Sequence, residues 1–121
     1  MSIYLFILNI MENPFREELP VFGGRFRLVT EDNEFRMSHW VKGFGLVDSL
    51  NGNFILELET SFNLSKFEEH DGALKVYFEI YPDGSVQYES EIDLYKLTFS
   101  CKGQLHNLKD FSRTFKEFRS H

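Results

Sequence analysis

Residues 73–92 constrain the fold more than any other part of the chain, because their pattern allows a single strand pairing. The first half, ALKVYFEI, places an apolar side chain at every second position, which is the period of a strand with one buried face. Pro82-Asp83-Gly84 follows and predicts a three-residue hairpin loop, in which the glycine takes a left-handed conformation. The second half of the stretch then returns as the partner strand.

This loop length predicts the register, with Tyr81 opposite Ser85. The expected apolar pairs are Leu74–Ile92, Phe78–Tyr88 and Ile80–Val86. The expected pairs on the other face are Lys75–Glu91, Tyr77–Glu89 and Glu79–Gln87. A shift by one residue would bury the glutamates, so the pattern specifies the register strongly. The hairpin contains no catalytic motif.

The remaining segments predict a small β-rich domain. Apolar alternation indicates strands at residues 1–10, 25–30, 34–41, 53–60 and 93–102, the last with a bulge near Tyr95. Breaker residues predict a connection at 12–24 and a flexible break at 42–45. Ser65 and Glu68 have capping-box spacing, which predicts one helical turn within 61–72.

The C-terminal region has a helical period. Apolar side chains recur at spacings of three or four residues, at Leu105, Leu108, Phe111, Phe115 and Phe118. The predicted fold class is therefore α+β, predominantly β. We expect one domain, residues 1–121, with an antiparallel sheet or half-open barrel of about seven strands covered by a C-terminal amphipathic helix.

Composition indicates the cellular compartment of the protein. A single cysteine, Cys101, excludes an internal disulfide and favours the cytoplasm, where we expect it to be a small buried residue of a strand. The apolar residues 1–10 lack a basic leader and a cleavage site, and they are too short to span a bilayer. As an exposed strand, residues 3–10 would favour a homodimer formed by sheet extension.

Charge is unevenly distributed along the chain, whose net charge is -6 at pH 7. Residues 48–93 contain eleven acidic side chains against Lys66 and Lys75, whereas residues 94–121 contain six basic side chains against two acidic ones. The net negative charge argues against nucleic-acid binding. An acidic middle and a basic end instead predict two surfaces of opposite potential.

Recognised catalytic and cofactor motifs are missing from the sequence. The glycine pairs lack the spacing of a phosphate-binding loop, and the histidines lack metal-ligand spacing, so we expect no cofactor and no metal. His39 is the best candidate for a catalytic base in a small hydrolase, and the carboxylates of the pairs Glu57–Glu59 and Glu89–Glu91 could serve as acid and base.

The predicted outward face of the sheet is the stronger candidate for function. It combines carboxylates, which attract a basic protein, with tyrosines, which provide rigid contact area. The predicted partner-binding residues are Glu57, Glu59, Tyr77, Glu79, Tyr81, Glu89 and Glu91.

Four features occur in an order that resembles a known class of protein: His39-Trp40-Val41, the run from Leu50 to Phe54, Pro82-Asp83-Gly84 and a terminal amphipathic segment. Over roughly residues 35–118 the chain is similar to the small acidic β-rich immunity proteins of bacterial polymorphic-toxin and contact-dependent inhibition systems. The resemblance implies a non-enzyme that binds a cognate toxin, often a basic nuclease, and blocks its site.

The leading hypothesis is thus a cytoplasmic interaction protein, an inhibitor or immunity factor that binds a basic partner. One alternative is a half-open barrel whose phenylalanine-rich interior holds a small apolar ligand. The other is the small hydrolase with His39.

Overall fold

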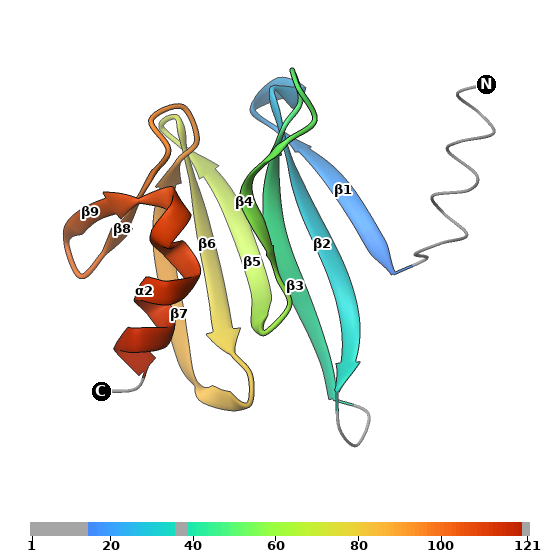
Figure 1. Ribbon diagram of the computed structural model, residues 1–121, viewed down its shortest axis with the longest axis vertical. Coiled ribbons are helices and arrows are strands. Elements are labelled where there is room, and N and C mark those ends of the chain that lie inside the picture. The colour runs from blue at the N-terminus through green and yellow to red at the C-terminus, as the bar shows by residue number, and fades with distance from the viewer. Residues whose placement is uncertain (1–14, 36–38, 120–121) are drawn as a thin grey trace.

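The computed structural model describes residues 15–35 and 39–119, and it contains two antiparallel sheets and one α-helix (Figure 1). The strands of the first sheet lie in the order β1-β2-β3-β4 and those of the second in the order β5-β6-β7-β8-β9. The predicted class, α+β and predominantly β, is confirmed. The element bounds are β1 Arg16–Val21, β2 Phe26–Phe35, β3 His39–Asp48, β4 Phe54–Glu59, β5 Phe62–His70, β6 Ala73–Ile80, β7 Asp83–Asp93, β8 Thr98–Cys101, β9 Gln104–Asn107, η1 Phe22–Gly24, η3 Leu108–Asp110 and α2 Phe111–Arg119.

The predicted central hairpin is formed by β6 and β7. The pairs confirmed by the structure are Leu74–Ile92, Lys75–Glu91, Tyr77–Glu89 and Phe78–Tyr88. Along β6 every second side chain is buried, starting with Leu74. The apolar period therefore determined both the pairing and the inner face.

The loop of this hairpin differs from the prediction. The turn is formed by Tyr81 and Pro82, joined by a cis peptide bond, and Ile80 pairs with Asp83 after a register shift. Because of this shift Val86 does not lie opposite Ile80, and its side chain is 41% exposed. The expected pairs of Glu79 with Gln87 and of Tyr81 with Ser85 are likewise lost.

The break predicted at 42–45 is wrong, because these residues lie inside β3. A Cβ atom on Gly43 would lie 2.8 Å from Cα of Thr60, and one on Gly45 would lie 2.8 Å from the carbonyl oxygen of Leu56. Glycine is needed here because β4 crosses closely over β3, which is one of the known roles of glycine within a strand.

Several other boundaries also differ from the prediction. Residues 12–24 contain the edge strand β1, and residues 31–33, which separate the strands expected at 25–30 and 34–41, lie within β2. The helical turn expected in 61–72 is β5, where a bulge after Leu64 interrupts the alternation and mimics helical spacing. Ser65 accepts a hydrogen bond from the Gln87 side chain (3.2 Å) instead of capping a helix. The apolar segment 1–10 lies outside the described residues.

At the C-terminal end, the bulge expected near Tyr95 is a four-residue turn between β7 and β8. The helix starts later than predicted, at Phe111, and Leu105 belongs to β9 with 75% of its surface exposed. The side chain of Phe118 is outside the described part of the structure. Cys101 is buried in β8, as predicted. No helix within residues 15–35 and 39–119 has the length and apolarity required to cross a bilayer.

The core lies between the sheets and α2. Phe111 and Phe115 of the helix contact Phe78 of β6 at ring-centroid distances of 5.6 and 5.1 Å, and Phe44 and Phe62 pack against Phe111 at 6.1 and 6.0 Å. Fully burying one such ring stabilises the fold by about 1.5–3 kcal/mol. Phenylalanine rings therefore contribute much of the contact between the helix and the sheets.

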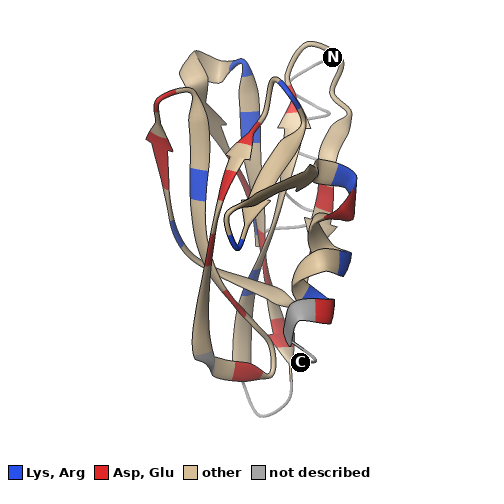
Figure 2. Ribbon diagram, turned by 90° about the vertical axis from the view of Figure 1, so that its left-hand side faces the viewer, with Lys and Arg blue, Asp and Glu red and all other residues tan. Residues whose placement is uncertain are grey.

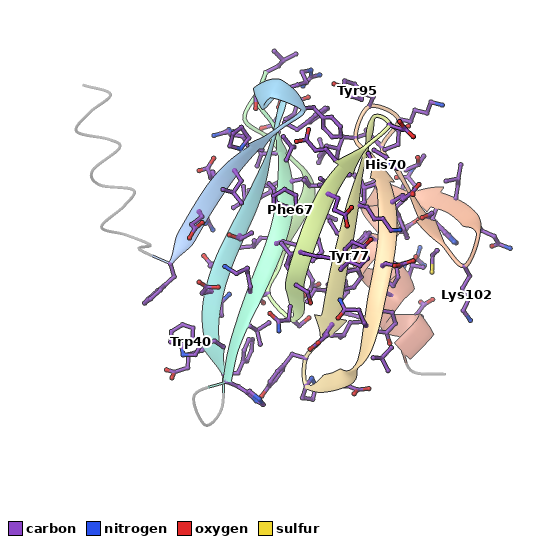
Figure 3. All side chains as sticks on the ribbon, turned by 180° about the vertical axis from the view of Figure 1, so that it is seen from behind. Trp40, Phe67, His70, Tyr77, Tyr95 and Lys102 are labelled. Atoms are coloured by element: carbon purple, nitrogen blue, oxygen red, sulfur yellow. The ribbon has the colours of Figure 1, made fainter. Side chains whose placement is uncertain are left out.

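The two sheets meet where β3 and β5 lie side by side (Figures 1 and 3). The backbone N–H of Lys42 in β3 donates a hydrogen bond to Oδ1 of Asn63 in β5 (2.9 Å). The N–H of Tyr81 donates to the carbonyl of Ser61 (2.8 Å), which extends the β5–β6 pairing to the hairpin turn. This junction, which we call the seam, places the end of β6 beside the start of β3.

Candidate functional site

Four of the predicted binding residues share one face of the second sheet. Tyr77 and Glu79 of β6 alternate with buried residues, and Glu89 and Glu91 of β7 pair with Tyr77 and Lys75. Their face is opposite to the one covered by α2: the helix lies on one side of the strands in Figure 2, and Tyr77 lies on the other side, which is turned toward the viewer in Figure 3. We call this surface the outer face.

Lysines moderate the negative charge of the outer face. The ammonium groups of Lys66 and Lys75 lie 4.5 and 5.4 Å from the ring centroid of Tyr77. Lys75 also lies 3.9 Å from the Glu89 carboxylate, and Lys66 lies 3.6 Å from Glu68. A hydrogen bond to Tyr77 and the charge of Glu89 raise the pKa of Lys75, so Lys75 is firmly cationic.

The part of the outer face next to β8 has mixed charge. A shallow depression of about 320 Å³ is lined there by Lys75, Glu89, Ser90, Glu91, Ser100, Lys102 and Gly103. Two lysines thus accompany two glutamates, and exposed pairs of this kind contribute little binding energy.

Glu57 and Glu59 lie elsewhere, on β4 beside the helix. The Glu59 carboxylate is 3.1 Å from Nζ of Lys116 on α2, and it accepts hydrogen bonds from the Ser61 hydroxyl (2.6 Å) and the Ser61 N–H (3.1 Å). Burial by itself would raise the pKa of Glu59, but the bonds from Ser61 and Lys116 outweigh burial and lower it. Glu59 therefore attaches the helix to β4, and Glu57 lines a hollow beside Leu108 and Lys109.

The remaining predicted residue, Tyr81, lies at the seam with Glu79. They line a notch of about 160 Å³ together with His39, Trp40, Val41, Asn63, Pro82, Asp83 and Gly84. None of these lining residues is a lysine or an arginine. The end of the outer face at the turn between β6 and β7, which we call its lower end, is thus more acidic than the end near β8.

Aromatic stacking fixes the walls of the notch. The Tyr81 ring stacks on Phe35 of β2 at a centroid distance of 4.7 Å and an interplanar angle of 22°. His39 meets the Tyr81 ring edge-on at 5.7 Å. Trp40 is 49% exposed and also contacts Phe15 at 5.5 Å. A rigid aromatic surface of this kind is typical of protein interfaces.

Sequence reasoning found Glu79 and Tyr81 but missed Asn63, Asp83 and the aromatic walls. Asn63 precedes a bulge in a segment that was expected to be helical, and Asp83 was assigned to the loop alone. The proximity of His39 to Tyr81 depends on the junction of the two sheets, for which the sequence has no local signal.

The notch presents two carboxylates, one imidazole and aromatic rings. His39 is exposed and contacts an aromatic ring. Within the described part of the chain, no group of three His, Cys, Asp or Glu side chains is arranged to hold a metal ion.

Comparison with protein-family models, curated proteins and solved structures gave no match. The fold is thus that of a small α+β protein with two antiparallel sheets. An aromatic and acidic notch lies at the seam between these sheets.

Proposed function

We propose that this protein is a non-catalytic interaction domain that binds a basic protein partner through the outer face and the notch at its lower end. The observation that carries the proposal is the notch, where Glu79 and Asp83 adjoin exposed Trp40 and no lysine or arginine contributes to the lining. Aromatic residues provide contact area at low entropic cost, and carboxylates provide steering and charge complementarity.

The proposed binding surface is narrower than the one expected from the sequence. Tyr77, Glu79, Tyr81, Glu89 and Glu91 belong to it. Glu57 and Glu59 are excluded, because they lie beside the helix and Glu59 is engaged by Lys116. The two groups of glutamates therefore provide a test residue and a matched control.

The specific form of the proposal is a cytoplasmic inhibitor of the immunity type, which covers a basic surface of a toxin. The similarity of size, charge and pattern supports this form. The buried side chains form one continuous cluster across the interior, which favours an interaction protein over a carrier of a small apolar ligand.

The test is a titration of the native partner, captured from its own cells and purified, against three forms of the protein. We expect Glu79→Lys/Glu91→Lys to bind at least about ten-fold more weakly than wild type, a loss of about 1.4 kcal/mol. Glu57→Lys, beside the helix, makes half of this change in net charge and should bind like wild type. Association should also weaken between about 0.1 M and about 1 M salt, because exposed charge attraction is screened.

Unchanged affinity of the double variant would refute the assignment of this face. A loss of about half as much binding free energy in Glu57→Lys would show that net charge alone drives binding. For the immunity form, the partner's toxic activity must be blocked by wild type at equal molar amounts and must persist with the double variant.

A further inference from the structure

We propose that the notch receives one arginine side chain of the partner, which anchors the complex at the seam between the two sheets. This inference rests on the proposed function and adds the identity of the group that is bound. It also explains why the two sheets bring Glu79, Tyr81 and His39 together at one point.

The size of the notch fits a single side chain. Its volume is about 160 Å³, whereas pockets for small molecules and cofactors measure about 300–1,000 Å³. Its lining combines aromatic rings with polar groups, and the buried side chain of Val41 also contributes to it. A site of this size that is built from both sheets matches a pocket for one protruding residue of a protein partner.

A cationic group would complement the charge of the notch. Glu79 is partly buried, and none of the ion pairs in the described part of the chain uses it. Its carboxylate lies next to Gly84, so close that a Cβ atom on Gly84 would be 3.2 Å from Oε2. A partly buried carboxylate gains most when a partner supplies a hydrogen-bonded positive group.

Arginine matches these walls better than lysine does. The guanidinium group is planar and can pack flat against aromatic rings, and it presents paired N–H donors to a carboxylate. An ammonium group is more strongly hydrated and lacks this plane. The Phe35–Tyr81 stack holds the aromatic wall in place before binding, which reduces the entropic cost of association.

The test uses three short peptides that need no natural partner: acetyl-Gly-Arg-Gly-amide and its counterparts with lysine and with citrulline, the neutral analogue of arginine. Binding is followed by the shifts of backbone amide signals in NMR spectra of the full chain. We expect saturable shifts at His39, Asn63 and Gly84 with the arginine peptide, and a dissociation constant on the order of 1 mM. The lysine and citrulline peptides should each bind at least about ten-fold more weakly.

Two variants probe the carboxylate. Glu79→Gln removes its charge, and Gly84→Ala leaves the charge unchanged but displaces the carboxylate by a few tenths of an ångström, since the new methyl group would lie 3.2 Å from Oε2. Both should weaken arginine binding at least about five-fold, whereas Glu57→Gln, beside the helix, should leave it unchanged. A preserved spectrum elsewhere in the chain shows that each variant is folded.

Equal binding of the citrulline or the lysine peptide would overturn the proposal, and so would shifts that map to Glu89 and Glu91, or an absence of saturable shifts. These results are separate from the partner titration. If the notch does not select arginine but Glu79→Lys/Glu91→Lys still releases the partner, the interaction face stands without the anchor. If the notch binds arginine but the partner ignores the double variant, the proposed face fails.

Discussion

Gly45 allows a test in which two interpretations of the same residue predict opposite signs. If residues 42–45 were a flexible break, Gly45→Ala would stabilise the protein by about 0.4–1 kcal/mol, because it reduces the entropy of the unfolded chain. In the structure Gly45 lies inside β3, and a Cβ atom would be 2.8 Å from O of Leu56 and 2.9 Å from N of Leu58. The substitution should therefore destabilise the fold.

The magnitude follows from what must move. Both of these atoms belong to the backbone of β4, so the overlap cannot be relieved by a side-chain rotation. Overpacking of this kind costs about 1–3 kcal/mol. Gly45 does not have a left-handed φ, so this cost is steric and contains no term for backbone strain.

The assay is urea unfolding followed by circular dichroism, with Gly52→Ala as the control. Gly52 has a φ of +75° and nothing within 4 Å of an added Cβ, so its substitution reports backbone strain alone, about 1 kcal/mol. With a slope of about 2 kcal/mol per molar urea, Gly45→Ala should lower the midpoint by about 0.5–1.5 M. A midpoint equal to or above that of wild type would refute the close approach of β4 to β3.

Two further predictions concern the helix contact and the hairpin turn. The pKa of Glu59 is lowered in the folded state, so its stabilising contribution is complete above the ordinary glutamate pKa of about 4.3 and is lost as the pH falls below that value. Glu59→Gln should therefore lower the free energy of unfolding by about 1 kcal/mol at pH 7 and flatten the acid-unfolding curve below pH about 5. An unchanged curve would contradict the Lys116–Glu59 contact. Val86→Lys should change the free energy of unfolding by no more than about 0.5 kcal/mol, because Val86 is 41% exposed. A loss of several kcal/mol in chemical denaturation would instead support the inward position predicted from the register.

The structure separates the predicted binding residues into two groups at different places on the surface. Tyr77, Glu79, Glu89 and Glu91 share a face because β6 and β7 are adjacent strands with a period of two, which the sequence contains in full. Glu57 and Glu59 were grouped with them on charge alone, and β4 lies beside the helix. Local periodicity predicts which side of its own strand a residue occupies, but it does not predict how separate strands are oriented relative to each other.

The sequence by itself determined three features: the hairpin at 73–92, the class of the fold, and the burial of Phe111 and Phe115. Each of them depends on a strict local period of apolar side chains. The tertiary structure decided where that period fails: bulges changed the phase in β5 and at the turn of β7, and the crossing of β4 required glycine within β3. It also decided the notch, whose residues come from β3, β5, β6, the turn after β6 and the start of β7. The physical reason is that a pocket at a seam is made by long-range packing of two sheets, and no single segment of the chain contains that information.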